Sequence, residues 1–176
     1  RKINFIEQLM LIILVYLLIG FFIAIPFYLS NFQINFISAF FESISGLTGT
    51  GFSIFENIKY LDPTLIIWRS SSQWIGGLYF LFFLILIFSN KQFKYKMNDF
   101  TYSGDGSINS ENNIKGLLFK IIILYVILSF VIFLSLNVSG VRMFNSLNLS
   151  MTLVSAGGFL PSNSLENIIN TNPKKI

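Results

Sequence analysis

The sequence predicts an all-α membrane protein made of repeated helix, re-entrant loop and helix units, one complete and one truncated. Three observations support this fold class. First, the 176 residues are 53% hydrophobic and 11% charged, whereas about 25% of a typical soluble domain is charged. Second, no side chain other than tyrosine can ionise from Gln8 to Phe41, a run longer than the roughly 20 residues of a spanning helix. Third, the same order of elements recurs along the chain.

Three stretches are long and apolar enough to cross a bilayer: residues 9–29, 65–88 and 117–136. At 1.5 Å per residue they reach roughly 30–36 Å, the thickness of the hydrocarbon core. The first stretch is longer than the 7–15 apolar residues of a signal peptide, so we expect a retained span. Because the sequence opens on Arg1 rather than methionine, we expect its true start to be missing.

Residues 36–46 (FISAFFESISG) form a shorter apolar stretch. It is too short to span a membrane and too apolar for a solvent loop, which predicts a re-entrant half-helix. Residues 47–53 (LTGTGFS) follow, and their two glycines break a helix. Non-helical backbone at membrane depth is tolerated only where it is packed in protein or lines a watery path. The first unit is therefore predicted to be a span, a half-helix, an extended segment and a second span.

A gapless shift of 107 residues lays the later part of the chain on the earlier part, aligning Gly51 with Gly158 and Phe52 with Phe159. Span, half-helix and glycine segment then recur in register. Internal repeats of this size are typical of membrane transport proteins, whose substrate path lies at the repeat interface. We therefore divide the chain into a first unit (1–88), a cytoplasmic linker (89–115) and a second unit (116–176) truncated after its glycine segment.

The basic residues predict the orientation of the chain. Six of them lie on one face, before the first span or in the linker: Arg1, Lys2, Lys91, Lys94, Lys96 and Lys115. The opposite loop, residues 30–64, carries only Lys59. The positive-inside rule therefore places the N-terminus and the linker in the cytoplasm, although Lys174 and Lys175 disagree. Lys120 is expected to extend to the cytoplasmic interface.

The two glycine segments have a chemistry suited to a dehydrated cation. The C-terminal end of a half-helix carries about half a negative charge, and carbonyls that follow it can replace the water shell of an ion. Gly51 supplies the φ freedom that turns successive carbonyls to one side, and Thr48 and Thr50 add hydroxyl oxygens. Glycines and hydroxyls also serve close helix packing, but two copies in register favour a path-lining role.

Several function classes are excluded by composition. The chain has no cysteine and no histidine, so disulfides, Cys/His metal sites and imidazole chemistry are absent. The net charge of +4 is too small and scattered for nucleic-acid binding. No paired carboxylates lie within a span, which argues against an intramembrane hydrolase. We expect neither an enzyme nor a cofactor.

Three sequence runs carry a resemblance to a known family: FFESISGLTGTGFS, LIIWRSSSQWIGGLYF and FNSLNLSMTLVSAGGF. They resemble the first pore loop, the following helix and the second pore loop of the Trk/Ktr/HKT superfamily of potassium transporters. The resemblance implies four helix, pore-loop and helix units around one pathway. It also implies a first filter at Thr48, Gly49, Thr50 and Gly51, and a second filter at Ser155, Ala156, Gly157 and Gly158. Gly49 stands where the family often has threonine, and Ala156 contributes no polar side chain.

The resemblance further implies potassium transport through a carbonyl-lined filter, since a glycine at the position of Gly51 accompanies potassium selectivity in the family. It implies a multi-pass protein of the bacterial inner membrane. The implied assembly is a homodimer in the lipid bilayer whose cytoplasmic face binds a nucleotide-sensing regulatory subunit. Two alternatives stay open: a sodium or mixed-cation transporter of the same fold, and a non-transporting membrane scaffold whose glycines serve helix packing.

Three polar residues near the predicted pathway are supporting candidates. Glu42 either lends negative potential to the pathway or accepts hydrogen bonds from backbone behind the glycine segment. Arg69 is expected to extend toward the outer interface or to clamp loop carbonyls rather than to take a direct part in gating. Gln73, beside Gly76 and Gly77, is expected to pack the second span against the pore loop. The aromatic residues Trp68, Trp74, Tyr60 and Tyr79 are expected to lie at the interface or in packing contacts.

Overall fold

The computed structural model of the protein describes residues 4–89 and 110–169. The predicted cytoplasmic linker falls mainly on residues 90–109, outside the described part, as do Lys174 and Lys175. The described residues are helical with connecting segments between the helices, and no strand occurs among them. The elements are α1 (Phe5–Tyr28), α2 (Phe36–Leu47), the 3-10 turn η1 (Ile58–Tyr60), α3 (Pro63–Ser89), α5 (Ser110–Val138), α6 (Met143–Val154) and α7 (Leu165–Ile169).

Three of these helices are long and apolar enough to cross a membrane, which confirms the predicted fold class. The candidate spans are Ile6–Tyr28, Pro63–Ile87 and Gly116–Val138. They begin one to three residues before the predicted stretches and end within two residues of the predicted ends. Large exposed apolar side chains cover much of α1 and α5, as expected for helices that face lipid or further protein.

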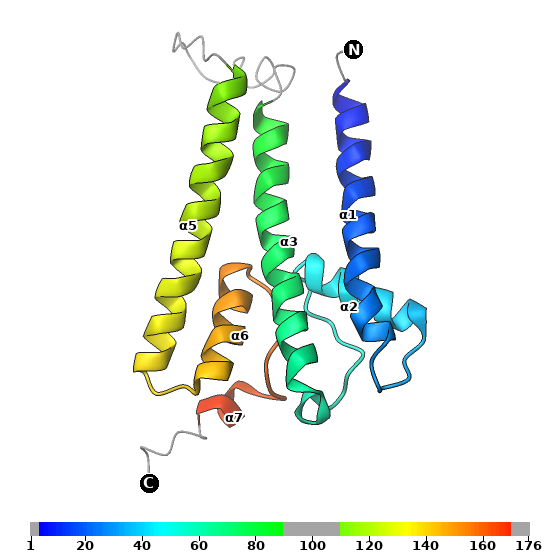
Figure 1. The fold of residues 1–176 in the computed structure, drawn as a ribbon, viewed down its shortest axis with the longest axis vertical. Helices are drawn as coiled ribbons and strands as arrows, with labels where there is room; N and C mark the ends of the chain where they lie inside the picture. Colours follow the sequence, from blue (N-terminus) through cyan, green and yellow to red (C-terminus); the bar gives the residue numbers. More distant parts are fainter. Residues whose placement is uncertain (1–3, 90–109, 170–176) are drawn as a thin grey trace.

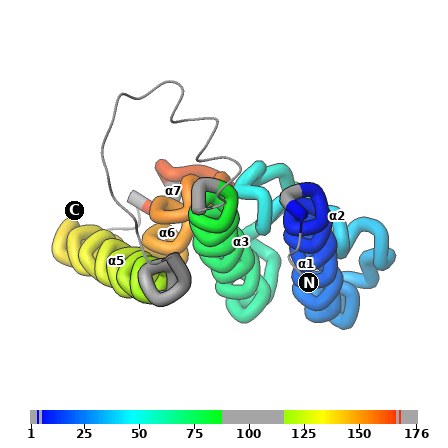
Figure 2. The backbone as a smooth tube through the Cα atoms, turned by 90° about the horizontal axis from the view of Figure 1, so that it is seen from above, coloured from blue at the N-terminus to red at the C-terminus, as the bar shows by residue number. Residues whose placement is uncertain are grey.

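Each of the two short helices begins near one end of the long helices, and the chain afterwards returns to that same end. α2 and α6 both start near one end of the long helices and stop near their middle, and the chain then returns to the end from which it came (Figure 1). Each has 12 residues, and α6 lies at the predicted offset of 107 residues from α2. α3 lies in the middle of the row, with α1 and α2 on one side and α5 and α6 on the other (Figure 2).

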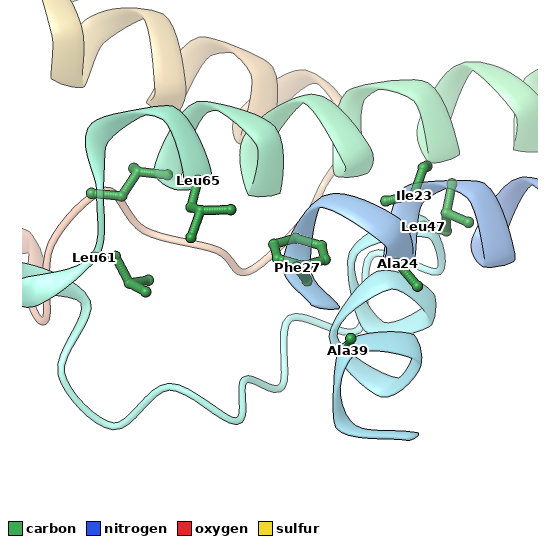
Figure 3. Close-up of a cluster of buried hydrophobic side chains, with 8 residues drawn as sticks. Ile23, Ala24, Phe27, Ala39, Leu47, Leu61 and Leu65 are labelled. Atoms are coloured by element: carbon green, nitrogen blue, oxygen red, sulfur yellow. The ribbon is translucent and has the colours of Figure 1, made fainter. Parts of the chain in front are cut away.

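A cluster of buried apolar side chains holds α1, α2 and the start of α3 together (Figure 3). Its members are Ile23, Ala24, Phe27, Ala39, Leu47, Leu61, Leu65 and Ile66. Phe27 is fully buried, and burying a phenylalanine side chain stabilises a fold by about 1.5–3 kcal/mol. The cluster therefore fixes the half-helix α2 against two spans.

Small residues allow the half-helices to approach the spans closely. A Cβ atom at Gly76 would lie 2.0 Å from the carbonyl oxygen of Leu47, at the end of α2. A Cβ atom at Gly77 would lie 2.9 Å from the Cβ of Ser155, just after α6. As predicted, Gly76 and Gly77 allow close packing of α3, and the contacts are with the end of α2 and with the residue that follows α6, so that both units are involved.

We predict that Gly76→Ala destabilises the protein by about 3 kcal/mol, because the new methyl group meets backbone that cannot move aside. Gly116→Ala in α5 is the matched control, since a Cβ atom there has no neighbour within 4 Å. Its effect should stay within about 1 kcal/mol, the difference in helix propensity between the two residues. Thermal unfolding of the detergent-solubilised protein checks both values, and equal stability of the two variants would contradict the packing.

Candidate functional site

The first half-helix ends in a cap that satisfies its last carbonyls. Thr48 follows α2 as the capping residue. The N–H of Gly49 then donates to the carbonyl of Gly46 (3.0 Å), and the N–H of Thr50 donates to the carbonyl of Ser45 (3.1 Å). This pair of bonds defines a Schellman motif, which requires a left-handed residue at the position of Gly49. Gly49 has φ +68°, so its glycine supplies that conformation.

The second half-helix ends in the same cap, 107 residues later. The N–H of Ala156 donates to the carbonyl of Leu153 (3.2 Å), and the N–H of Gly157 donates to the carbonyl of Thr152 (2.8 Å). Ala156 adopts φ +54°, the conformation that Gly49 has in the first unit. An alanine in this region costs about 1–2 kcal/mol, so the cap is strained in the second unit.

Side chains repeat the same pattern. The hydroxyl of Ser45 donates to the carbonyl of Phe52 (2.5 Å), and the hydroxyl of Thr152 donates to the carbonyl of Phe159 (3.0 Å). These bonds tie each returning chain to its own half-helix at equivalent positions. The structural repeat therefore extends from helix boundaries down to individual hydrogen bonds, although few residues are identical.

The two glycine segments, defined here as residues 48–51 and 155–158, lie side by side. A Cβ atom at Gly51 would lie 2.6 Å from the Cα of Gly158, and a Cβ atom at Gly158 would lie 3.1 Å from the Cα of Gly51. Gly51 therefore requires glycine for the backbones to meet, and a Cβ atom at Gly158 would be tightly confined. The structure brings together all eight predicted residues, and all are at least partly exposed: Thr48, Gly49, Thr50, Gly51, Ser155, Ala156, Gly157 and Gly158.

The threonine hydroxyls of the first segment are oriented by the end of α2. Thr48 Oγ1 donates to the carbonyl of Ile44 (2.9 Å). Thr48 Oγ1 and Thr50 Oγ1 lie 2.5 Å apart, so the Thr50 hydroxyl is the donor between them once the Thr48 proton is used. The Thr48 proton then points toward α2 and the Thr50 proton points toward Thr48 Oγ1. The Thr50 oxygen keeps its lone pairs free for another partner.

Glu42 and Arg69 form a buried ion pair behind the first segment. Arg69 Nε lies 2.8 Å from Glu42 Oε1, and the two side chains are 1% and 0% exposed. Glu42 also accepts hydrogen bonds from the N–H of Ile54 (2.9 Å) and the hydroxyl of Ser53 (3.0 Å). Of the two predicted roles of Glu42, hydrogen bonding to backbone behind the segment is thus observed. The pair ties α2, α3 and the returning chain together.

The prediction that Arg69 extends toward the outer interface is wrong. Its guanidinium group is buried because the carboxylate of Glu42 provides a partner inside the protein. Arg69 also donates to no loop carbonyl among the described residues: its Nη2 donates to the hydroxyl of Ser53 (3.0 Å). The guanidinium carbon also lies 4.2 Å from the ring centroid of Phe159, within the range of a cation–π contact. Arg69 therefore contacts both units.

Gln73 lies one helical turn beyond Arg69 and also contacts the second unit. Its side chain is fully buried, and its Oε1 accepts a hydrogen bond from the N–H of Phe159 (3.3 Å). Sequence reasoning missed Phe159 and Ser53 as partners of these two residues. The signal for Phe159 was the Gly-Phe pair that recurs at residues 51–52 and 158–159. The sequence contains no comparable signal for Ser53 as a partner of Arg69.

The aromatic residues of α3 serve packing, as predicted. Trp68 Nε1 donates to the carbonyl of Ile23 (3.0 Å), and Trp74 Nε1 donates to the hydroxyl of Ser129 (2.9 Å). Tyr79 donates to the carbonyl of Ile12 (2.7 Å), whereas Tyr60 in η1 is exposed. These bonds connect α3 to the long helices on both sides and hold it in register with them.

Comparison with known proteins matches this chain to cation transporters. The sequence profile of the TrkH family, described as a cation transport protein, matches residues 3–173. An uncharacterized cation transporter of Methanocaldococcus jannaschii is 32% identical over 154 residues, which cover 85% of this chain and 31% of that protein. The Trk system potassium uptake protein TrkI of Halomonas elongata is 35% identical over 72 residues, and TrkG of Escherichia coli is 30% identical over 73.

The match to TrkI and the match to TrkG each cover 41% of this chain and 15% of the relative. The chain thus spans less than a third of the length of the curated relatives it matches. No solved structure matches the chain.

We predict that Arg69→Met destabilises the protein by about 3–5 kcal/mol, because it leaves the Glu42 carboxylate buried without its partner. The double variant Glu42→Gln with Arg69→Met removes both charges and should be more stable than Arg69→Met alone. Thermal unfolding of four proteins provides the measurement: the unmutated protein, Arg69→Met, Glu42→Gln and the double variant. A double variant whose loss equals the sum of the single losses would show that the two groups do not interact.

We predict that Ala156→Gly stabilises the protein by about 0.5–1 kcal/mol, the relief of the left-handed strain less the added chain entropy of glycine. Gly49→Ala is the reciprocal change and should cost about 1–2 kcal/mol. Space does not limit it, since the nearest atom to a Cβ there, the carbonyl oxygen of Ser155, lies 3.7 Å away. A lower unfolding midpoint for Ala156→Gly together with a higher midpoint for Gly49→Ala would disprove the strain.

Proposed function

The chain belongs to the TrkH family of cation transport proteins, and from this premise we propose that it forms part of a transmembrane pathway for potassium ions. The two glycine segments supply oxygen ligands to the ion in this pathway. The observation that carries the proposal is the contact between Gly51 and Gly158. This contact joins the segments that follow α2 and α6, two half-helices of different repeat units whose C-terminal ends lie near the middle of the long helices (Figure 1).

The electrostatics of the half-helices support a cation at this place. α2 and α6 both point their C-terminal ends toward the glycine segments, and each end carries about half a negative charge. Glu42 adds no net charge, because Arg69 neutralises it. Helix ends and backbone oxygens therefore dominate the local potential, which suits an ion that sheds its water.

The backbone of the first segment supports carbonyl ligation. Gly49 and Gly51 have φ +68° and +77°, whereas Thr50 between them does not have a positive φ. Such alternation turns neighbouring carbonyls toward the same side of the chain. In the second segment only Ala156 has a positive φ. We therefore assign ligands from Thr48, Gly49, Thr50 and Gly51, and from Ser155, Ala156, Gly157 and Gly158, with the more regular array in the first set.

Potassium is the proposed substrate rather than a bound cofactor. Two relatives are named potassium uptake proteins, and Gly51 matches the glycine that accompanies potassium selectivity in the family. A sodium or mixed-cation transporter would belong to the same family, and the uptake experiment below distinguishes it from a potassium transporter. The relatives are transporters rather than enzymes, so no catalytic residue is assigned.

The protein is a multi-pass membrane protein, and we propose the bacterial inner membrane as its location. The N-terminus of α1 and the ends of α3 and α5 that adjoin the linker lie at one end of the structure (Figure 1). We assign this end to the cytoplasm from the positive-inside rule. A homodimer in the lipid bilayer, with a nucleotide-sensing regulatory subunit on the cytoplasmic face, is the proposed assembly.

The test is uptake of potassium and sodium by the full-length protein in cells that lack other potassium importers. We predict that Gly51→Ser lowers the ratio of potassium to sodium uptake about tenfold or more, because its side chain meets the backbone of Gly158. Gly116→Ser is the matched control and should leave the ratio unchanged. Membrane levels of each variant are measured alongside.

A Gly51→Ser variant present at normal levels with an unaltered ratio would contradict a filter at this position. If that variant also assembled poorly, the membrane scaffold would be the better account of the glycines.

A further inference from the structure

Gln73 lies on the first unit but contacts the second glycine segment. We propose that Gln73 is a positioning residue that fixes the geometry of residues 155–158 and so tunes the cation preference of the pathway. The inference rests on the proposed function above. Its structural basis is the hydrogen bond from the N–H of Phe159 to Gln73 Oε1 (3.3 Å), which joins residues 86 positions apart in the sequence.

A side chain at residue 157 would collide with this amide. A Cβ atom at Gly157 would lie 2.3 Å from Cδ, 2.4 Å from Oε1 and 2.6 Å from Nε2 of Gln73. The φ angle of Gly157 is not positive, so conformational freedom does not explain the glycine. The side chain of Gln73 thus occupies the volume in which a side chain at residue 157 would lie, and the amide rests directly on the segment's backbone.

Phe159 is held at three points immediately after the segment. Gln73 accepts from its N–H, the hydroxyl of Thr152 donates to its carbonyl (3.0 Å), and the guanidinium carbon of Arg69 lies 4.2 Å from its ring centroid. Its equivalent in the first unit, Phe52, is 69% exposed, whereas Phe159 is 1% exposed. These contacts leave Gly158 little freedom to move between a fixed Phe159 and the end of α6.

Space filling alone does not account for an amide here. Gln73 Nε2 is buried and has no hydrogen-bond partner among the described residues. A buried polar group without a partner is unfavourable relative to an apolar side chain of similar size. Methionine would fill the same volume without this cost. The hydrogen bond to Phe159 is therefore the specific contribution that glutamine makes at this position.

The first test compares Gln73→Met with the matched control Ile75→Met, an exposed position on the same helix. Both are made in the full-length protein and reconstituted into liposomes, and initial rates of rubidium and sodium uptake are measured. We expect Gln73→Met to lower the rubidium to sodium ratio about tenfold, the effect of one hydrogen bond of typical strength, with the unfolding midpoint little changed. A folded Gln73→Met variant with the unaltered ratio overturns the proposal.

The second test is a double-mutant cycle between Gln73 and Gly157, which keeps the proposal falsifiable if Gln73→Met does not fold. Gly157→Ala should lower the ratio about tenfold while the glutamine is present, because the new methyl group meets its amide. In the Gln73→Ser background the same change should have less than a twofold effect. Equal effects of Gly157→Ala in both backgrounds overturn the proposal.

The two proposals fail in different ways. If Gly51→Ser leaves uptake and selectivity unchanged, the glycine segments do not form the filter, and the proposed function fails. If Gly51→Ser alters selectivity but Gln73→Met and the cycle do not, only the positioning role of Gln73 fails.

Discussion

Two half-helices end inside this protein, so the backbone N–H and C=O groups at their ends need hydrogen-bond partners there. At membrane depth no solvent is freely available to supply them, and an unsatisfied buried backbone group costs several kcal/mol. The structure meets this constraint twice with the same cap, at Gly49 and at Ala156. The residues that follow the two caps meet at Gly51 and Gly158.

α3 fixes both runs from one helical face. Arg69, Gln73, Gly76 and Gly77 follow each other at helical spacing. The two polar residues hold the returning chains, and the two glycines admit the ends of α2 and α6. One helix of the first unit thus shapes the candidate site of both units. In membrane transporters with internal repeats, substrate sites lie at the repeat interface, which is where these shared contacts occur.

The sequence predicted the spans, the half-helices and the 107-residue repeat, because apolar length and glycine position depend on local physics. It also identified the eight residues that the structure brings together. It was wrong about Arg69, since the pairing with Glu42 joins residues 27 apart and no local pattern encodes it. The strain at Ala156 was equally hidden, because alanine at a left-handed cap position is visible only from its φ angle.

The most direct test of the proposed cation pathway is to locate a bound ion. Cryo-electron microscopy or crystallography of the full-length protein in thallium or rubidium salt would reveal it. We expect density at coordination distance from the carbonyl oxygens of residues 48–51 and 155–158. Density bound only elsewhere along an open path, with these oxygens covered by side chains, would contradict the account.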